Sequence, residues 1–452
     1  MMADTIAAIA TGMVKSAIGI VRLSGADAVA AVSAVFTPAS GKAFGDYPPG
    51  RLILGTLRDA DGAVIDQCLA TYAKAPHSYT GEDTAELQCH GSPAVLTAAL
   101  EAVFAHGVRQ AGPGEFTRRA FLNGQLDLIQ AEAVADLIDA QTPDAVRNAA
   151  GQLGRAMTEQ IEGVAEQLTH LLAHFHVVLD YPDEDIEPLE AQEITRTLHA
   201  AADTLERLKA TYRRGRQLTE GVPCAIVGRP NAGKSSLLNA LLGYDRAIVT
   251  PIPGTTRDTV EERCVLGGVL LRLVDTAGLR DTEDTVERMG VERSRQALER
   301  SELALVLLDG SEQLTDADRE ILALSEGCPR RLVLVSKSDL PTVLALPEGV
   351  EAISISSATG EGLEQLEQAV AALFAQNAPV QGQMLTNARQ AEAVGRAAQC
   401  LRGAGDALEV GLPADAVLSD AEAALGALHE LTGQSVSESV TDHIFRRFCV
   451  GK

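Results

Sequence analysis

The N-terminal part of the chain carries short apolar runs that are separated by polar turns. Ile6–Ala10 and Gly19–Leu23 are two such runs, joined by a loop of small and polar residues. The pattern continues with three more apolar runs, Arg51–Gly55, Cys68–Ala73 and Glu86–Gly91, and one longer stretch, Ser92–Ala105. Runs of this length between turn residues are typical of strands, and the longer stretch is typical of a helix. We therefore predict a mixed α+β domain over residues 1–120.

From residue 121 onward the apolar positions change to helical spacing. They recur three and four residues apart, first at Leu126, Ile129, Ala133 and Leu137, and then at Ile161, Val164, Leu168, Leu171 and Phe175. Alternating threes and fours are typical of the seam of an antiparallel bundle. We predict one long helical run from Phe121, then helices at Ala191–Tyr212, Asn387–Leu408, Ala414–Leu431 and Val440–Phe448. This α-helical bundle is divided between residues 121–215 and 376–452, so the domain between its halves is an insertion.

Two charged stretches interrupt the helical pattern. Asp180–Ile186 holds an acidic cluster, which we interpret as a solvated turn because no other ligand-type residues are spaced for a metal. Arg213–Arg216, at the end of the helix expected over Ala191–Tyr212, is interpreted as the hinge into the next domain.

A glycine-rich loop lies at the start of the middle domain. The apolar run Cys224–Val227 is followed by Gly228–Ser236, which has the form G-x-x-x-x-G-K-[ST], and then by the helical stretch Leu237–Leu242. A strand, this loop and a helix in that order are the context of a phosphate-binding loop, whose backbone N–H groups cradle phosphates at the positive end of the helix. Lys234 is expected to reach the β- and γ-phosphates, and the Ser235 hydroxyl to bind Mg²⁺.

Four further signals follow in the order of a guanine-nucleotide domain. Ile248–Asp258 is a Gly- and Pro-punctuated loop where a switch I is expected, and a Thr hydroxyl there can complete the Mg²⁺ shell only with γ-phosphate bound. Asp275–Gly278 follows a strand, with Asp275 placed for the Mg²⁺ shell and the Gly278 N–H for sensing the γ-phosphate. Ser336–Asp339 follows the run Leu332–Val335. Asp339 can accept two N–H groups of guanine, a pattern that adenine does not offer. Ser356–Gly360 would touch the guanine O6.

One position in this domain lacks the expected side chain. Leu279 follows Asp275–Gly278, where a Ras-like protein has a glutamine that orients the attacking water. Leucine can neither orient nor polarise water, so another polar group must do so, and the run Asp281–Glu292 is rich in candidates. With this domain at residues 216–375, the chain is predicted to be multidomain: α+β, then an α-helical bundle with an inserted α/β Ras-like domain.

Composition limits the class of protein. A chain of 452 residues is long enough for roughly two to four domains. A hydrophobic content of 46% without a long apolar run favours a soluble globular protein. Met1–Thr5 carries an acid and no basic stretch, so we expect no secretory signal. The seven cysteines never form a C-x-x-C pair, so we expect a reduced, cytoplasmic setting with neither a disulfide framework nor a zinc site.

The charge balance restricts the partners. A net charge of −24 opposes non-specific adhesion to nucleic acid or to an anionic membrane, although a local basic patch or a basic partner could still hold RNA. Aromatic residues make up only 3% of the chain and Trp is absent, which disfavours a stacking platform for bases.

Three polar residues leave alternatives open at this stage. Arg22 and Glu86 each lie inside an apolar strand, where an unpaired charge is costly, and they form either a structural ion pair or a ligand contact. Cys449, near a terminal lysine, is either a buried apolar residue or a group with a redox or nucleophilic role.

The chain as a whole resembles the MnmE (TrmE) family of tRNA-modification GTPases. Besides the nucleotide motifs, the resemblance rests on Ile18–Gly25, Tyr79–Asp83, Pro113–Thr117, Arg119–Gly124 and the terminal Cys449–Lys452. It implies a homodimer formed through N-terminal domains that resemble folate-binding modules. It also implies a heterotetramer with MnmG, a partner that uses FAD and NADH. Together they would add an aminomethyl or carboxymethylaminomethyl group to C5 of the wobble uridine of certain tRNAs.

The resemblance also implies roles for individual residues. The one-carbon unit would come from 5-formyl- or 5,10-methylene-tetrahydrofolate, contacted by Arg22, Glu86, Gln125 and Lys452. GTP would be hydrolysed with K⁺ in place of an arginine finger, the cation being held by Asn231, Thr250, Ile252 and Thr255, and Mg²⁺ by Ser235 and Thr256. Glu287 would orient the water, and Lys234 and Cys449 complete the catalytic set. The remaining GTP contacts are expected at Ala232, Gly233, Ser236, Pro251, Pro253, Gly254, Asp275, Thr276, Ala277, Gly278, Ser336, Lys337, Ser338, Asp339, Ser356, Ser357 and Ala358.

Three positions depart from the family pattern. Ser336 stands where the family has Asn, and its shorter side chain is expected to lose a bond to the base or to the phosphate loop, a cost of about 1 kcal/mol. We predict weaker nucleotide binding with guanine selectivity retained. Ser356-Ser357-Ala358 replaces Ser-Ala-Lys, a milder change. Gln125 replaces a common Lys and removes one positive charge from the folate site.

Two other functions are compatible with part of the sequence. A ribosome-assembly GTPase of the Era or Der kind shares Gly254–Asp258 and the K⁺ chemistry, but it would need a KH domain or a second phosphate loop, and neither is visible. A folate-dependent transferase acting alone would need its own redox cofactor site, and no second Gly-rich dinucleotide motif follows a strand.

Overall fold

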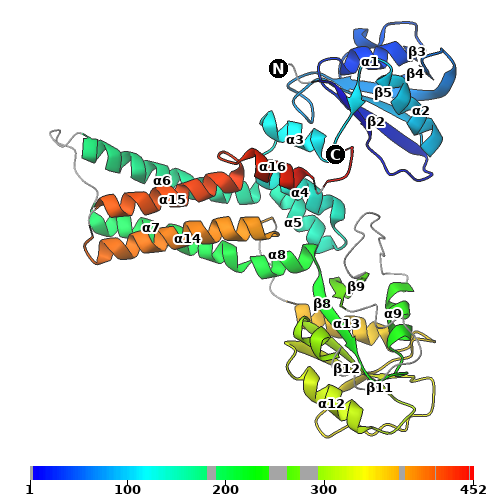
Figure 1. The fold of residues 1–452 in the computed structure, drawn as a ribbon, viewed down its shortest axis with the longest axis vertical. Coiled ribbons are helices and arrows are strands. Elements are labelled where there is room, and N and C mark those ends of the chain that lie inside the picture. Colours follow the sequence, from blue (N-terminus) through cyan, green and yellow to red (C-terminus); the bar gives the residue numbers. More distant parts are fainter. Residues whose placement is uncertain are drawn as a thin grey trace. The chain divides into compact units, whose positions relative to one another are not determined.

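The structure, a computed structural model, describes residues 4–180, 190–243, 262–274, 294–375, 382–412, 414–446 and 448–451 (Figure 1). The chain divides into two compact units, each assembled from separate stretches of sequence. Unit 1 comprises residues 1–135, 152–195 and 403–452, and unit 2 comprises residues 136–151 and 196–402.

A seven-stranded sheet forms the N-terminal part of unit 1. Its strand order is β3-β4-β5-β6-β2-β1-β7, and all neighbours are antiparallel except β1 and β7. The strands are β1 Ile6–Ile9, β2 Ile18–Ser24, β3 Phe36–Pro38, β4 Ile53–Arg58, β5 Val64–Ala73, β6 Thr84–His90 and β7 Arg109–Gln110. The five predicted strands are confirmed, with ends shifted by a few residues. The short β3 and β7 were not predicted.

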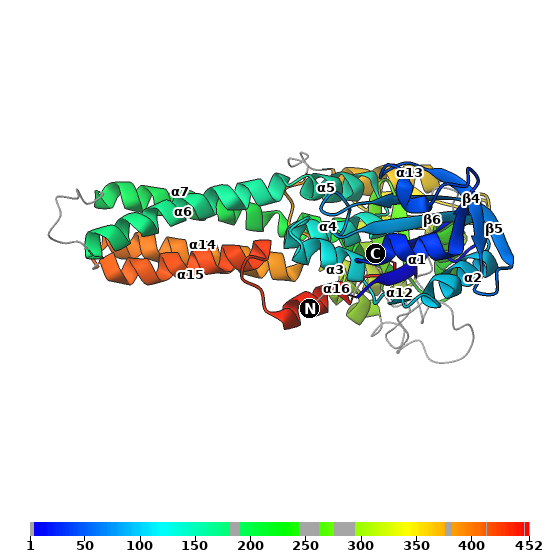
Figure 2. The ribbon, with the colours of Figure 1, turned by 90° about the horizontal axis from the view of Figure 1, so that it is seen from above.

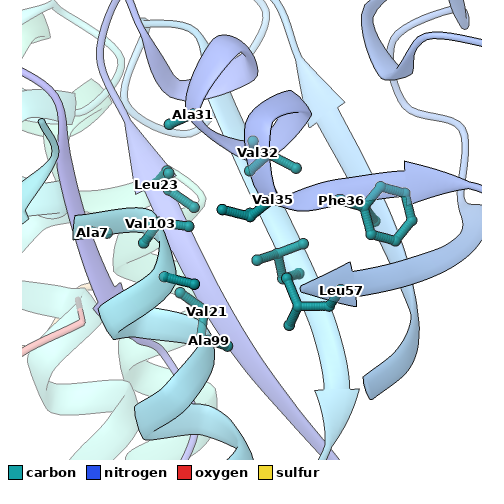
Figure 3. Close-up of a cluster of buried hydrophobic side chains, with 14 of the residues drawn as sticks. Ala7, Val21, Leu23, Ala31, Val32, Val35, Phe36, Leu57, Ala99 and Val103 are labelled. Atoms are coloured by element: carbon teal, nitrogen blue, oxygen red, sulfur yellow. The ribbon is translucent and has the colours of Figure 1, made fainter. Parts of the chain in front are cut away.

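Helices α1 (Ala28–Val35) and α2 (Pro93–Phe104) cover one face of this sheet. Buried and less buried residues alternate along β2, β4 and β6, as the period of a strand requires. Figure 3 shows the resulting core, where Val21 and Leu23 of β2 face Val32 of α1 and Val103 of α2. The mixed α+β domain is confirmed.

The remaining helices of unit 1 are shorter than the sequence predicts. One long run was expected from Phe121, but the chain forms α3 Glu115–Leu122, α4 Leu128–Asp139, α5 Pro143–Leu153 and α6 Ala156–Asp180, of which α5 belongs mostly to unit 2. The break before α4 is a reciprocal cap: the Gln130 N–H donates to Asp127 Oδ1 at 2.8 Å, and the Asp127 N–H donates to Gln130 Oε1 at 3.0 Å. Such a cap starts a new helix because it satisfies N–H groups that have no helical partner.

Two C-terminal helices return to unit 1. Helix α15 (Ala414–Thr432) runs beside α6 in both views (Figures 1 and 2). Helix α16 (Glu438–Phe445) packs on α3, and an apolar cluster of Leu128, Ala131, Ile444, Phe445 and Phe448 lies beneath them. Most of the acidic cluster Asp180–Ile186 lies outside the described residues.

Unit 2 contains a six-stranded sheet with the order β13-β12-β11-β8-β10-β9. Every neighbouring pair is parallel except β9 and β10. The strands are β8 Val222–Val227, β9 Glu262–Leu266, β10 Val269–Leu273, β11 Leu303–Asp309, β12 Arg330–Ser336 and β13 Ala352–Ser354. All seven residues of β11 are buried, which is expected of a central parallel strand covered on both faces. The two faces pack against α9 (Lys234–Gly243) with α13 (Leu363–Phe374), and against α12 (Asp316–Ser325).

Three further helices of the chain, α7, α8 and α14, lie outside the sheet, and one of them contains the segment that was expected to be a hinge. Helix α7 (Ala191–Ala210) is followed almost at once by α8 (Tyr212–Thr219), so Arg213–Arg216 is helical and is not a hinge. Gly215 is packed so closely on the Leu385 carbonyl that an added Cβ would lie 2.0 Å from its oxygen. Helix α14 (Ala388–Glu409) pairs through Arg402 with Asp203 and Glu206. In the described part of the chain, no helix combines the length and apolar character that crossing a bilayer requires.

Candidate functional site

The phosphate loop joins the end of β8 to the start of α9. Asn231 has φ 63° and Gly233 has φ 95°, so two of its residues adopt the left-handed conformation that turns backbone N–H groups inward. Lys234 begins α9, and its Nζ donates to the carbonyl oxygens of Gly228 and Arg229, both at 2.7 Å. Burial lowers the pKa of Lys234 to about 8. The ammonium group therefore lies over the loop, where a phosphate would supply the counter-charge that it lacks.

The segment Ser336–Asp339 meets the phosphate loop directly. Ser336 Oγ donates to the Ala232 carbonyl at 2.7 Å and is 3.1 Å from the Leu308 carbonyl oxygen. The expectation that the shorter serine could lose its bond to the phosphate loop is therefore wrong, because the loop carbonyl lies close enough for the hydroxyl. The serine could therefore lack only the hydrogen bond that an asparagine would make to the base.

Hydrogen bonds of the Ser356 hydroxyl connect the residues that are expected at the guanine base. Ser356 Oγ donates to Asp339 Oδ1 at 2.6 Å, which fixes one carboxylate oxygen. Ser356 also accepts from the Thr359 N–H at 3.2 Å, so the turn containing Ser357 and Ala358 is closed on the same hydroxyl. The structure thus brings together three of the predicted segments: residues 231–236, 336–339 and 356–358.

Asp309 was not identified from the sequence as a site residue. It ends β11 with its side chain only 2% exposed, and its Oδ2 lies 2.6 Å from Lys337 Nζ and 3.8 Å from the guanidinium of Arg229. Although burial opposes ionisation, hydrogen bonds from Lys337 and Ser311 hold the pKa of Asp309 below its usual value. One carboxylate therefore connects the phosphate loop to the base-recognition segment. The signal that could have found it is an acid at the carboxyl end of a buried central strand.

Several predicted site residues lie outside the described residues. They are the switch residues Thr250, Pro251, Ile252, Pro253, Gly254, Thr255 and Thr256, the group Asp275, Thr276, Ala277 and Gly278, and also Glu287 and Lys452. Their roles stay predictions.

In unit 1, Arg22 and Glu86 face each other across β2 and β6. They are register partners, and Arg22 Nε lies 2.9 Å from Glu86 Oε1. Both side chains are about a quarter exposed, at 23% and 24%. The guanidinium carbon of Arg22 also lies 5.9 Å from the ring centre of Tyr79 and 6.0 Å from that of Phe116. The structural ion pair is present, and its partial exposure leaves both groups within reach of a ligand.

Gln125 lies on the loop after α3 and is exposed. Its side chain packs beside Gly81, two residues from Tyr79. The turn containing Tyr79 and Gly81 therefore touches both Arg22 and Gln125, two of the three predicted folate contacts that the structure describes.

Behind this turn lies a buried charge cluster that sequence reasoning missed. The Arg119 side chain, 9% exposed, makes ion pairs at 3.0 Å with each of Glu82, Glu115 and Asp4. Although burial opposes it, hydrogen bonds from Arg109, a backbone N–H and Arg119 lower the pKa of Glu115 to about 2. The cluster fixes the start of α3 against the turn that holds Tyr79. Glu115 and Arg119 are four residues apart on α3, but Asp4 and Glu82 come from distant parts of the sequence, so no local pattern indicates the whole cluster.

The C-terminal segment docks on the N-terminal sheet. Val450 forms a β-bridge with Pro113, and the Gly114 N–H donates to the Cys449 carbonyl at 3.3 Å. Gly451 has φ 101°, and a Cβ there would lie 2.3 Å from the Ile9 carbonyl oxygen, so only glycine fits. Cys449 is exposed, and its interpretation as a buried apolar residue is therefore wrong.

Comparisons with known proteins cover nearly the whole chain. The family model described as the GTP-binding protein TrmE N-terminus matches residues 5–125, and the MnmE helical domain model matches residues 128–449. A "tRNA modification GTPase MnmE" of Roseiflexus sp. (strain RS-1) is 43% identical over 465 residues, covering 99% of each chain. A relative of the same name from Symbiobacterium thermophilum is 44% identical over 455 residues, again covering 99% of each.

Among solved structures, Aquifex aeolicus Era bound to GDP·AlF4⁻ is 28% identical, covers 39% of this chain and 65% of its own, and has a TM-score of 0.26. The two family models follow one another along the chain, and the named relatives match it from end to end. The chain therefore belongs to the MnmE family of tRNA modification GTPases.

Proposed function

We propose that this chain is a K⁺-dependent GTPase that modifies the wobble uridine of tRNA together with an FAD-containing partner, MnmG. The product carries an aminomethyl or carboxymethylaminomethyl group at C5, with the one-carbon unit taken from a tetrahydrofolate derivative. The observation that carries the GTPase part is the contact of the base-recognition segment with the phosphate loop, Ser336 Oγ to the Ala232 carbonyl at 2.7 Å. Such a contact holds two halves of a nucleotide site in register.

Guanine selectivity rests on Asp339 in this proposal. One of its oxygens is occupied by the Ser356 hydroxyl at 2.6 Å, which orients the carboxylate. A carboxylate accepts two N–H groups of guanine and rejects adenine, since a mispaired buried group costs about 1–3 kcal/mol. An Asp339→Asn variant should lose GTP and gain the xanthine nucleotide, whose 2-oxo group can accept from the new amide.

Two cations complete the nucleotide site. Ser235 at the start of α9 and Thr256 would hold Mg²⁺, and Asn231, Thr250, the Ile252 carbonyl and Thr255 would hold K⁺. K⁺ supplies positive charge next to the phosphates, where other GTPases use an arginine. Glu287 would orient the attacking water, a task that Leu279 cannot perform.

The N-terminal domain provides the one-carbon site in this proposal. Arg22, Glu86, Gln125 and Lys452 contact the folate, and two copies of the chain pair through these domains and form a heterotetramer with MnmG. The docking of Val450 on Pro113 supports this part, because it anchors the C-terminal segment on the domain that holds Arg22. Cys449 is exposed and thus available for a chemical role.

One experiment tests the nucleotide chemistry. GTP turnover by the purified full chain is measured in K⁺ and in Na⁺ buffers, for the wild type and for Glu287→Gln, with Glu283→Gln as the matched control. We expect turnover that needs K⁺ and falls at least a hundredfold in Glu287→Gln only. Equal rates in the two buffers, or an unaffected Glu287→Gln, contradict the mechanism.

A second experiment tests the biological role. Nucleosides from the tRNA of cells lacking the chain are analysed by mass spectrometry, with the wild type and Glu287→Gln reintroduced separately. We expect loss of the C5 modification and rescue by the wild type alone. Normal wobble uridines together with a ribosome-assembly defect would favour an Era- or Der-like switch instead.

A further inference from the structure

Two cysteines and an aspartate meet on the covered face of the N-terminal sheet. The register of β5 and β6 pairs Leu69 with Gln88, so the preceding Cys68 lies opposite the following Cys89. Asp66 is two residues before Cys68, and this spacing places both side chains on the same face of β5. The carboxylate and the two sulfur atoms all lie within 4.8 Å of one another. Both thiols are buried.

The carboxylate is held in place by the strand that carries the second thiol. The backbone N–H of His90, next to Cys89, donates to Asp66 Oδ2 at 2.8 Å, and His90 Nδ1 lies 2.8 Å from Asp66 Oδ1. The Asp66 side chain is only 9% exposed, whereas His90 is 75% exposed. Metal-ligating carboxylates are usually oriented by hydrogen bonds from neighbouring groups. Asp66 receives such bonds from His90 and lies beside two thiols.

The sheet positions beside the two cysteines carry no side chains of their own, and Leu96 and Phe36 pack over them. Cys68 pairs with Gly55 on β4, and Cys89 pairs with Gly19 on β2, so both outer neighbours in this row are glycines. In the described part of the chain, this is the one group of three His, Cys, Asp or Glu side chains whose ligand atoms approach so closely. The sequence predicted no zinc site because no cysteines form a C-x-x-C pair, but strand pairing joins two that are far apart in the chain.

We propose that Cys68, Cys89 and Asp66 bind one thiophilic divalent cation of the Zn²⁺ class. Zinc with bonds of about 2.3 Å to sulfur places two tetrahedral sulfur ligands about 3.8 Å apart, a spacing compatible with this group. Binding releases both thiol protons to solvent and leaves two thiolates and one carboxylate on the metal. The site belongs to the N-terminal sheet and does not depend on the proposed GTPase chemistry.

The chemistry of the three side chains explains why the site would hold a cation and not an anion. Two sulfur atoms and a carboxylate oxygen within 4.8 Å of one another are the donor types that a thiophilic cation prefers. The alternative is a disulfide between Cys68 and Cys89, but a disulfide would not explain why the Asp66 carboxylate is held beside the two sulfur atoms.

The test uses the full chain, reduced and stripped of metal with a chelator. It is titrated with Cd²⁺, whose thiolate bonds absorb in the ultraviolet, and with Zn²⁺ by calorimetry. We expect one equivalent bound with both ions. Cys68→Ala and Cys89→Ala should each weaken binding at least a hundredfold, and Asp66→Asn at least tenfold, because the amide replaces an anionic ligand with a neutral one.

The matched control is Cys264→Ala, which removes a buried thiol in unit 2 and should leave binding unchanged. Circular dichroism of each metal-free variant verifies that it folds. If a cysteine variant does not fold, Asp66→Asn still tests the site because it keeps both thiols. No thiolate absorption, or equal affinity in wild type and all three variants, overturns the proposal. So does a chain that is two hydrogen masses lighter as purified and takes up no metal, because the pair is then a disulfide.

Discussion

The ion pair at the nucleotide site and the Arg22–Glu86 pair of the N-terminal domain differ in how their charges are exposed to solvent. At the nucleotide site, Asp309 is almost completely buried, and it holds Lys337 at 2.6 Å beside a loop built from consecutive residues. In the N-terminal domain, Arg22 and Glu86 pair at 2.9 Å with about a quarter of each side chain exposed. In the first pair only the carboxylate is buried, because the Lys337 side chain is 35% exposed, whereas in the second pair both partners are partly exposed beside two aromatic rings. A buried carboxylate shared by several partners fixes geometry, whereas a pair whose two members are both partly exposed can be opened by a ligand.

The largest effect is expected from removing the buried carboxylate of the first pair. Asp309→Ala leaves Lys337 and Arg229 without a shared partner and removes the acceptor for Ser311. Asp309 accepts hydrogen bonds from Lys337 and from Ser311, and losing the bonds to a buried charged group costs about 3 kcal/mol, so we expect the free energy of unfolding to fall by about that amount, with GTP affinity falling at least tenfold. Urea unfolding and nucleotide titration measure the two effects.

The control for this variant keeps the shape and removes only the charge. Asp309→Asn can still accept from Ser311, so its loss of stability should be smaller than that of Asp309→Ala. If both variants unfold like the wild type, Asp309 does not connect the two segments, and the contrast with Arg22 and Glu86 disappears.

A somewhat smaller effect is expected from the docking of the C-terminal segment. Gly451→Val puts a branched side chain at φ 101° and within 2.3 Å of the Ile9 carbonyl oxygen. A residue strained in this region costs about 2 kcal/mol, which should release the segment. Hydrogen exchange would then rise at the Gly114 N–H, which donates to Cys449. Gly41→Val, with φ 80° and open space around its Cβ, serves as the control for strain alone. Equal protection in both variants contradicts the docking.

The same contrast explains what the sequence could predict. The phosphate loop is recognisable because consecutive residues determine its backbone, including the left-handed Asn231 and Gly233. The Arg119 cluster and the group of Asp66, Cys68 and Cys89 are not, because strand register, set by non-local packing, brings their members together. The hinge expected at Arg213–Arg216 failed for a related reason: Gly215 weakens a helix locally, but here it allows close packing on the Leu385 carbonyl.

An intermediate effect is expected from the titration of Lys234. Its pKa is about 8 in the nucleotide-free protein because of burial, and a bound phosphate would favour the charged form. Below pH 8 the ammonium is charged in both states, so GTP affinity should not depend on this group. Above pH 8 the free protein loses the proton, and binding must recover it. Affinity should therefore fall about tenfold by pH 9, one pKa unit being about 1.4 kcal/mol.

Fluorescence titration of a GTP analogue between pH 7 and pH 9.5 measures this dependence. Lys234→Arg, which stays charged throughout, should bind with an affinity that changes little over the range. An equal decline in Lys234→Arg would assign the titration to another group.

A smaller effect is expected at Ser336. Ser336→Ala removes the hydroxyl that donates to the Ala232 carbonyl and should weaken GTP binding by about 1 kcal/mol. Ser336→Asn should tighten binding only through a contact with the base, because the bond to the phosphate loop already exists. Calorimetry with GTP compares both variants with the wild type. Unchanged affinity in both would mean that this position does not influence the nucleotide.

The smallest effect on stability, and the sharpest test of the contrast, is expected at Arg22 and Glu86. A partly exposed pair contributes about 0.5 kcal/mol, so Arg22→Met and Glu86→Gln should each change the free energy of unfolding only slightly. A double-mutant cycle measures their coupling.

If the pair opens to hold a folate, each variant should nevertheless lose at least tenfold in affinity for 5-formyl-tetrahydrofolate. Arg58→Met, on the exposed end of β4, is the control. Unchanged folate binding together with a coupling above about 2 kcal/mol would make the pair purely structural, because such strong coupling is typical of a desolvated pair.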